Sequence, residues 1–500
     1  MTLELTENSA TDVQHLKKNA VGSAGIVFFV VSAAAPLTVV VGVPGVVFGL
    51  AGNYAAALGF LVAGIVLGLF SVGYAAMSNH ISGPGGFAVY VEMAFGRRLG
   101  GAAAYIALIG YGGFLIGIYG FFGYLAAPDF KTLGLSLPWW AWTFVCMAVV
   151  GAIGYRAIDL SAKIVSVLLC CEVTIVLIMD IAILAHGGHS GLSVSGFSVS
   201  QLFHSSPGVV LLFAVASFVG FEATTLYGEE ARDRHVTIPR ATYIAVVVIT
   251  AFYVFTFWLL GVAYGGDVIK VALASPGTFT FDAAHHYAGH WVSTTMSWLV
   301  LSSIFACLLA FHNGIARYLF ALGRSGLMAP KLGLSHGQHE SPYVASVVTS
   351  ALAVVLVGIC VVLRANPYVQ MYALMCGFGT VAMLVLYACG SLSVLGYLRR
   401  KGLDKRLWHS LVAPILGTAG LIVMIYLSIA NFSALTGSSN TLVNLLWLLP
   451  FIAAVIGYIV AAKRWHSTPL GGVSEGLSGE SGAGEPDPVG QSGVGGLHNL

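Results

Sequence analysis

The chain has 500 residues, of which 58% are hydrophobic and only 8% are charged, with a formal net charge of +2. A soluble domain carries about 25% charged residues, so this composition excludes an ordinary soluble protein and indicates an integral membrane protein. The near-balanced charge gives no reason to expect a nucleic-acid partner.

The first predicted element, residues 1–20, is a cytoplasmic tail. It contains Glu4, Glu7 and Asp12 and lacks a basic start leading into a short apolar core. It therefore does not resemble a cleavable signal peptide.

Apolar stretches of about 20 residues recur after this tail, and each is long enough to cross the hydrocarbon core as a helix. Because lipid cannot bond to free backbone groups, such stretches predict helices and not the short alternating strands of a barrel. We predict an all-α protein with about twelve spans: 22–44, 54–78, 101–126, 138–156, 162–185, 207–228, 239–264, 293–316, 343–363, 369–397, 411–431 and 441–462. With the N-terminus inside, 19 of the 22 basic residues are cytoplasmic and only Lys131, Lys270 and Arg364 are outside. This bias fits an even number of spans with both termini cytoplasmic.

The first span is interrupted by Pro36 and Pro44 in the stretch "VSAAAPLTVVVGVPG" (31–45). Pro36 removes a backbone donor and clashes with the preceding turn, so it is a candidate helix break. A broken helix is tolerated in lipid only where it lines a cavity or is buried, because its free amides and carbonyls need partners. A bound solute can be that partner, which makes the following residues substrate-binding candidates: Ala34, Ala35, Pro36, Leu37 and Thr38.

The fifth span carries two acids, Glu172 and Asp180. Acidic residues within a span are rare and usually face the protein interior or a cavity. Asp180 lies near the outer end of the span, where we expect it to be interfacial. The seven cysteines fall within predicted spans without metal-ligand spacing, so we expect small buried hydrophobes and no metal or other cofactor.

The sixth span ends in "FVGFEATTLYGEEARDRHVTIPRA" (218–241), with Gly220 and the ionisable Glu222 close to its middle. Glycine lowers the cost of non-helical backbone angles, so Gly220 predicts a second break. Glu222 would contact a substrate ammonium, act in gating or carry a proton; the alternative is a neutral acid bonded between helices. Phe218 and Phe221 either cover the site as an aromatic lid or pack in the core. The predicted substrate-binding residues here are Phe218, Val219, Gly220, Phe221 and Glu222.

The charged residues that follow mark the exit of this span into the cytoplasm. Glu229 and Glu230 would pair with Arg97 or Arg317 in an inner gate, unless they are simply a solvated loop. In the eighth span, Asn313 is an ion-coupling candidate, with His312, Ser302 and Ser303 beside it. Ordinary hydrogen bonding between helices explains these polar residues equally well.

The two breaks occupy corresponding places if the first ten spans form two halves of five. An odd number of spans per half inverts the second half relative to the first, giving repeats at about 21–186 and 205–400. A half-helix N-terminus favours an anion and the opposing carbonyls suit an ammonium group, so two facing breaks would bind a zwitterion. Residues 21–400 then form the transport core, 401–465 hold two further spans, and the Gly/Ser/Pro-rich 466–500 form a disordered cytoplasmic tail.

Three stretches carry a resemblance to the amino acid-polyamine-organocation superfamily. "GFEATTLYGEEARDRHVTIPRA" (220–241) is similar to its sixth-span signature, and "SVGYAAMSNHISGPGGFAVYVEMAFGRRLGG" (71–101) to its second-to-third-span loop. "GIARYLFALGRSGLMAPKL" (314–332) with "SPYVAS" (341–346) resembles the segment after its eighth span. The resemblance implies a LeuT-like fold and secondary transport. It also places Glu172 where several amino acid transporters have a lysine in place of a sodium ion, which makes Glu172 a proton-coupling candidate. The family's Gly-Ser-Gly-Ile-type first break is "SAAAPLT" (32–38) here, which leaves the exact carboxylate-binding groups open.

These observations predict a multi-pass permease of the cytoplasmic membrane that moves amino acids by alternating access, coupled to protons or by exchange. The alternative within the superfamily is a carrier of polyamines or other amines. A membrane receptor or a channel is the alternative from a different class. No HExxH, CxxC or GxSxG motif lies in the spans, so we do not expect an enzyme.

Overall fold

The structure, a computed structural model, describes residues 26–28, 30–31, 34–81, 86–156, 162–222, 234–335, 342–437, 440–464 and 470. Helices and turns account for these residues, and no strand occurs among them. Nine helical segments of this described part are long and apolar enough to cross a membrane. All twelve predicted spans overlap a helix, although the first, fourth and sixth coincide with shorter apolar helices, so the number twelve stays a prediction.

The first half of the chain supplies the helices that surround the two breaks. They are α2 (Pro36–Gly42), η1 (Gly45–Leu50), α3 (Ala56–Ser78), α4 (Gly86–Phe95), α5 (Arg97–Thr132), α6 (Trp139–Tyr155), α7 (Ala162–His186), α8 (Val199–His204) and α9 (Pro207–Ala216). Of these, the short α4 between the second and third spans was not predicted.

The second half repeats the pattern of long spans with short connecting helices. It contains α10 (Arg234–Tyr264), α11 (Val268–Ala274), α12 (Phe279–Ala288), α13 (His290–Arg324), α14 (Tyr343–Val362), η6 (Pro367–Ala373), α15 (Leu374–Val394), η7 (Leu395–Arg399), η8 (Trp408–Val412), α16 (Ala413–Ala430), α17 (Phe432–Thr436), α18 (Thr441–Asn444) and α19 (Leu449–Lys463).

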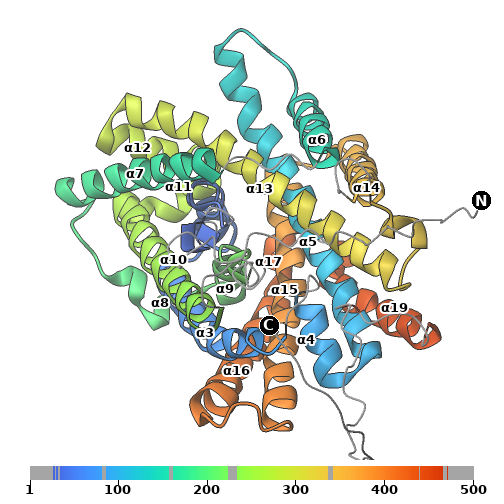
Figure 1. The fold of residues 1–500 in the computed structure, drawn as a ribbon. Coiled ribbons are helices and arrows are strands. Elements are labelled where there is room, and N and C mark those ends of the chain that lie inside the picture. The colour runs from blue at the N-terminus through green and yellow to red at the C-terminus, as the bar shows by residue number, and fades with distance from the viewer. Residues whose placement is uncertain are drawn as a thin grey trace, which may run out of the picture.

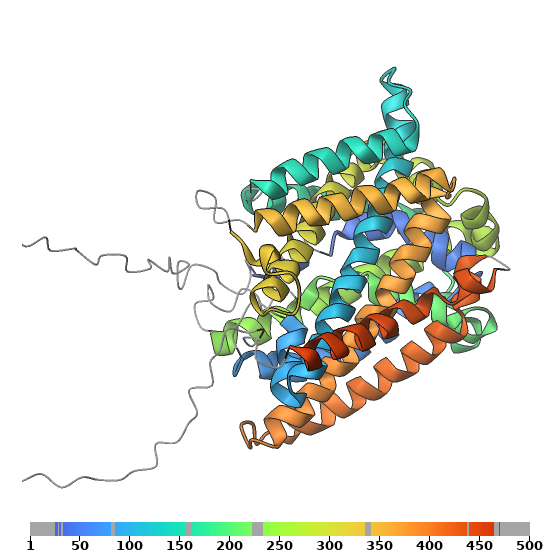
Figure 2. The same cartoon turned by 90° about the vertical axis from the view of Figure 1, so that its right-hand side faces the viewer.

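Helices α5 and α15 pack against each other near the centre of the molecule (Figure 1). On one side α3, α7 and α10 enclose the short helices of the breaks, and on the other α6, α14 and α19 cover α5 and α13 (Figure 1). In the view turned by 90°, α6, α14, α16 and α19 run in roughly the same direction, as expected of helices that cross one bilayer (Figure 2). The core therefore lies between two groups of helices, where the two breaks meet.

Both predicted breaks are present. In the first span Ala35 adopts a left-handed conformation with φ of 45° and ψ of 66°, and α2 begins directly after it at Pro36. A non-glycine residue in this region costs about 1–2 kcal/mol, so the surrounding packing must hold the break in place. In the sixth span α9 ends at Ala216, and Gly220 has a φ of 112° that glycine accepts without a Cβ penalty.

Pro44, the second proline of this span, does not interrupt the helix. Its backbone stays helical, with φ of −55° and ψ of −44°, and the wider π turns of η1 follow it. A widened turn accommodates the missing proline donor without separating the chain into two half-helices.

Most of the predicted C-terminal tail, 466–500, lies outside the described residues, but Leu470 is described. Its side chain is buried, and its amide donates to Glu92 Oε2 at 3.0 Å on α4. At this position, therefore, the predicted tail packs against the transport core.

Candidate functional site

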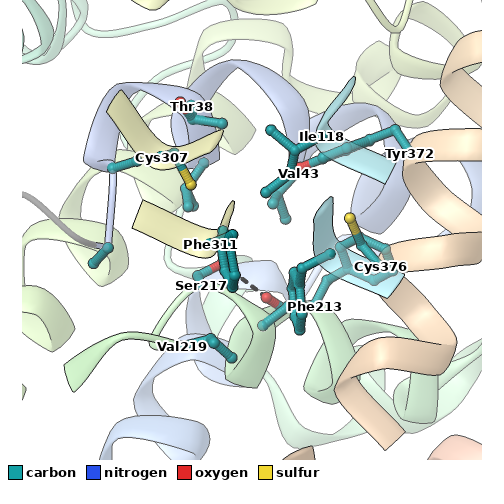
Figure 3. A pocket seen from close by; sticks show the side chains of 15 residues that line it. Thr38, Val43, Ile118, Phe213, Ser217, Val219, Cys307, Phe311, Tyr372 and Cys376 are labelled. Atoms are coloured by element: carbon teal, nitrogen blue, oxygen red, sulfur yellow. Dashed lines mark hydrogen bonds between the residues drawn. The ribbon is translucent and has the colours of Figure 1, made fainter. Parts of the chain in front are cut away.

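A small cavity lies between the two breaks, and Figure 3 shows the side chains around it. Residues of the first span lie on one side, including Thr38 and Val43, and residues that follow or end α9 lie on the other, including Ser217 and Val219. The lining residues are Ala34, Ala35, Thr38, Val39, Val43, Phe114, Ile118, Phe213, Ala216, Ser217, Val219, Cys307, Phe311, Tyr372 and Cys376. Five separate helical segments thus converge on one buried space.

The walls of this cavity are apolar, with few polar side chains. No residue among the fifteen that line it is charged. The ring of Phe311 on α13 stacks on Phe114 of α5, with centroids 5.4 Å apart and planes 6° apart. The Ser217 hydroxyl donates to the Phe213 carbonyl of its own helix at 2.8 Å. Orientation of a polar solute therefore depends largely on the backbone.

The ends of two helices supply that backbone. The helix Pro36–Leu50 begins at the cavity, and its first amides have no partner within their own helix. Helix α9 ends at the cavity, so its last carbonyls are directed toward the second break. The positive end of one helix dipole and the negative end of another thus border the same space.

The structure divides the ten predicted substrate-binding residues. Four of them line the cavity: Ala34, Ala35, Thr38 and Val219. The other six are adjacent but do not line it: Pro36, Leu37, Phe218, Gly220, Phe221 and Glu222.

Of the two alternatives for Phe218 and Phe221, packing in the core agrees with the structure. Phe218 and Phe221 are fully buried, and their rings pack edge-on against Tyr253 and Tyr387 respectively. The aromatic residues at the cavity are instead Phe114, Phe213, Phe311 and Tyr372. These positions were not identified from the sequence.

Glu222 is placed behind the break, within a buried hydrogen-bond network. Its carboxylate accepts the Gly220 amide at 2.9 Å, the Tyr111 hydroxyl at 2.9 Å and the Tyr387 hydroxyl at 3.1 Å. The Tyr74 hydroxyl donates to its backbone carbonyl at 3.0 Å. Through these bonds α3, α5 and α15 are joined to the chain that follows α9. Glu222 is not among the residues that line the cavity, in contrast to its prediction as a substrate-binding residue.

Sequence reasoning missed the three tyrosines of this network. A buried tyrosine hydroxyl normally finds a partner, but tyrosine is also common where spans meet the lipid headgroups. The sequence offered no signal that separates these two uses.

Glu172 lies next to the first break. The Ser303 hydroxyl of α13 donates to Glu172 Oε2 at 2.8 Å, and the Thr38 hydroxyl donates to Ser303 at 3.1 Å. The backbone of Leu37, in the first turn of α2, also bonds to this carboxylate. Glu172 is therefore linked both to a residue that lines the cavity and to the start of the half-helix.

Asn313 is not part of this arrangement. It follows Ser303 by ten residues on α13, which corresponds to a rise of about 15 Å. A methyl group built on Gly154 of α6 would lie 3.3 Å from Asn313 Oδ1, so the side chain is directed at α6. Asn313 therefore lies away from Glu172, and its role in ion coupling stays a prediction.

The predicted inner gate is only partly within the described residues. Glu229 and Glu230 lie outside them. Arg97 donates to the Ser325 carbonyl at 3.1 Å and lies 4.0 Å from Glu92, while Arg317 is exposed on α13. Arg97 thus connects the start of α5 to the end of α13.

Asp180 is not interfacial, which corrects the expectation from its place near the outer end of the fifth span. Its side chain is 0% exposed, and Oδ2 accepts the Thr256 hydroxyl of α10 at 2.6 Å. Asp180 faces the protein because it shares the buried side of α7 with Val176, Met179 and Ile183.

The chain matches a family model, known relatives and solved structures. The family model described as amino acid permease matches residues 25–469. The low-affinity putrescine importer PlaP of Escherichia coli is 23% identical over 300 residues, which cover 57% of this chain and 63% of the importer. The chain therefore spans less than two thirds of that relative. An uncharacterised transporter of Mycobacterium tuberculosis, Rv1999c, is 26% identical over 376 residues, covering 74% of this chain and 77% of the relative.

Among solved structures, a manganese transporter of Eremococcus coleocola superposes with a TM-score of 0.57. The match covers 91% of this chain and 97% of the other at 12% sequence identity. At this identity the likeness concerns the fold alone, and it confirms the LeuT-like fold that the resemblance implied.

Proposed function

The chain belongs to the amino acid permease family of membrane transporters, and from this premise we propose that it is a secondary active transporter for amino acids, coupled to protons. We place it in the cytoplasmic membrane with both termini inside, as the distribution of basic residues favours. Transport proceeds by alternating access, as net import or as exchange.

The single observation that carries the choice of substrate is the pair of helix ends at the cavity. The start of the helix Pro36–Leu50 offers amides to a carboxylate, and the negative dipole end of α9 suits an ammonium group. An amino acid presents both groups, and the apolar wall of Phe114, Ile118 and Phe311 suits its side chain.

Coupling follows from the position of Glu172. While ionised, its carboxylate occupies the Leu37 amide and repels a second carboxylate at the same helix end. A proton on Glu172 removes this repulsion and releases the amide. Proton binding and substrate binding therefore favour each other, which is the linkage that a symporter requires.

Glu222 has a separate role in this proposal. Its bonds to Tyr111 and Tyr387 hold α5 and α15 against the second break. An inward-open state separates these elements, so the network acts as a gate on the cytoplasmic side of the cavity.

An amine is the second candidate substrate, and one observation favours it. If Glu172 stays ionised, the carboxylate and the α9 carbonyls form an electronegative site that suits a cation and excludes a carboxylate. The similarity to a putrescine importer supports the same possibility.

The test is uptake into proteoliposomes of the purified full chain, with pools of labelled amino acids and, separately, labelled putrescine. Each is measured with and without an inward proton gradient. Gradient-stimulated uptake of an amino acid pool supports the proposal, whereas uptake of putrescine alone replaces it with the amine carrier. If neither pool is taken up or exchanged, the receptor or channel alternative is favoured.

A further inference from the structure

One hydroxyl group at the cavity is not used by the protein itself. The side chains of Thr38, Ser217 and Tyr372 each bring a hydroxyl to the lining. The first donates to Ser303 at 3.1 Å, and the second donates to the Phe213 carbonyl at 2.8 Å. The Tyr372 hydroxyl makes no hydrogen bond to any residue that the structure describes, although this residue is only 5% exposed. An unpaired buried hydroxyl is costly, so its position favours a ligand that supplies the partner.

Two neighbouring helices fix the position of Tyr372. It belongs to η6, and its ring stacks on Phe121 of α5, with centroids 4.4 Å apart and planes 24° apart. Its hydroxyl lies against α2 at Gly42, where a methyl group would be 2.8 Å from the tyrosine Cζ and would overlap the hydroxyl. Glycine at this position therefore leaves the space that the hydroxyl occupies. In Figure 3 the Tyr372 side chain extends toward Ile118 and Val43, which also line the cavity.

The Tyr372 hydroxyl is distant from both helix ends that border the cavity. Gly42 follows Pro36 by six residues, which corresponds to about 9 Å along α2. Because a hydrogen bond spans only about 3 Å, the hydroxyl does not reach a carboxylate at the start of this helix. The ring of Phe213, centred 6.3 Å from that of Tyr372, lies three residues before α9 ends at Ala216, where the ammonium group is expected. The hydroxyl therefore faces the remaining part of a bound amino acid, which is its side chain.

The walls of the cavity restrict what this side chain carries. None of the fifteen lining residues is charged, so a charged side chain would be buried there without a counter-ion. A wholly apolar side chain would leave the tyrosine hydroxyl unpaired. A hydroxyl or a carboxamide satisfies both conditions, because each is neutral and can both donate and accept a hydrogen bond. The small cavity favours a short side chain.

We propose that Tyr372 is a specificity-determining residue, whose hydroxyl forms a hydrogen bond with the side chain of the substrate. The substrates are then amino acids with a short, uncharged polar side chain that ends in a hydroxyl or a carboxamide. This inference rests on the proposed function, because it takes the two helix ends as the sites of the carboxylate and ammonium groups.

The test uses pairs of amino acids of similar shape, threonine with valine and asparagine with leucine. Each competes, unlabelled, for uptake of the labelled amino acid pool into proteoliposomes of the purified full chain, and its inhibition constant is measured. The carboxylate and ammonium groups are the same within a pair, so the ratio of the two constants reports on the side chain. We expect threonine and asparagine to bind about tenfold more tightly than valine and leucine, which is about the effect of one hydrogen bond. In Tyr372→Phe both ratios should fall to about one, because the ring remains and only the hydroxyl is lost.

Two further variants test whether the effect depends on this hydroxyl at this place. Gly42→Ala should also abolish the preference, because its methyl group takes the space of the Tyr372 hydroxyl. Tyr253→Phe is the matched control: its hydroxyl is likewise buried without a partner among the described residues, but Tyr253 does not line the cavity. Both ratios in Tyr253→Phe should equal those of the unaltered chain.

The outcomes separate this inference from the function on which it rests. If the unaltered chain takes up no amino acid, the proposed function fails and this inference fails with it. If amino acids are taken up without a preference for threonine and asparagine, or if Tyr372→Phe retains that preference in full, the inference is wrong and the function stands. Equal loss of the preference in Tyr253→Phe would also overturn it, because the effect would then not depend on the cavity. Should Tyr372→Phe fail to fold, a full preference in Gly42→Ala overturns the proposal.

Discussion

The hydrogen bond between Tyr111 and Glu222 gives a prediction whose size follows from the structure. Tyr111→Phe removes one of the donors to a buried carboxylate while leaving the ring in place. A hydrogen bond to a charged group contributes about 1.5–3 kcal/mol, so we expect the free energy of unfolding to fall by about that amount. In a Glu222→Ala background the hydroxyl has already lost its partner, so the same substitution should cost little.

The assay is a double-mutant cycle on purified protein in detergent, with the free energy of unfolding measured for both single variants and the double variant. The cycle cancels the cavity that alanine leaves and isolates the pairwise interaction. Tyr368→Phe is the control, because this buried tyrosine donates to the Gly42 carbonyl and not to Glu222. Its effect should add to that of Glu222→Ala within about 0.5 kcal/mol. A Tyr111–Glu222 interaction energy as small as that of the control would refute the network, and with it the proposed cytoplasmic gate.

Three further predictions concern the cavity, the coupling group and a pair outside the spans. Phe311→Ala removes a large part of the cavity wall. We expect KM for uptake to rise about tenfold, which corresponds to about 1.4 kcal/mol of lost binding free energy. An unchanged KM would place the substrate elsewhere. Ser303→Ala removes a hydrogen-bond donor to Glu172 and so destabilises the ionised carboxylate. The pH of half-maximal gradient-driven uptake should therefore rise. A fall in this pH would contradict the role of Glu172 as the proton-coupling group. The Arg406 guanidinium holds the pKa of Asp404 below its usual range. This pair, in which the arginine is exposed, therefore stabilises the fold above the unfolded pKa of about 3.9. The stabilisation is lost as pH falls through the lower folded pKa. Asp404→Asn should therefore cost only about 0.2–1 kcal/mol and leave the pH profile of uptake between pH 5 and 8 unchanged, as measured on the same vesicles.

The helix breaks could be predicted from the sequence because their causes are local. Pro36 cannot donate to the preceding turn, and Gly220 accepts a φ that other residues resist. Pro44 shows the limit of this reasoning, since a proline can also be accommodated by a wider turn. Which response occurs depends on the neighbouring helices.

The side-chain arrangement at the site was much less predictable. Successive residues of a helical turn differ by about 100° in direction, so Val219 lines the cavity while Phe218 packs in the core. Glu172 and Ser303 are 131 residues apart in the chain, and only the tertiary fold brings them together. Asp180 was misplaced for a related reason, because its depth in the span does not reveal which side of α7 it occupies.

The most direct test of the central claim is a measurement of substrate-driven proton movement. Proteoliposomes with a trapped pH-sensitive dye receive, from outside, the labelled pool that the protein takes up, with the unaltered chain and Glu172→Gln compared side by side. The account predicts acidification of the vesicle interior with the unaltered chain and its loss in Glu172→Gln, while exchange of labelled for unlabelled substrate persists in the variant. Acidification of equal size in the variant would show that Glu172 does not carry the coupled proton, and would contradict the account.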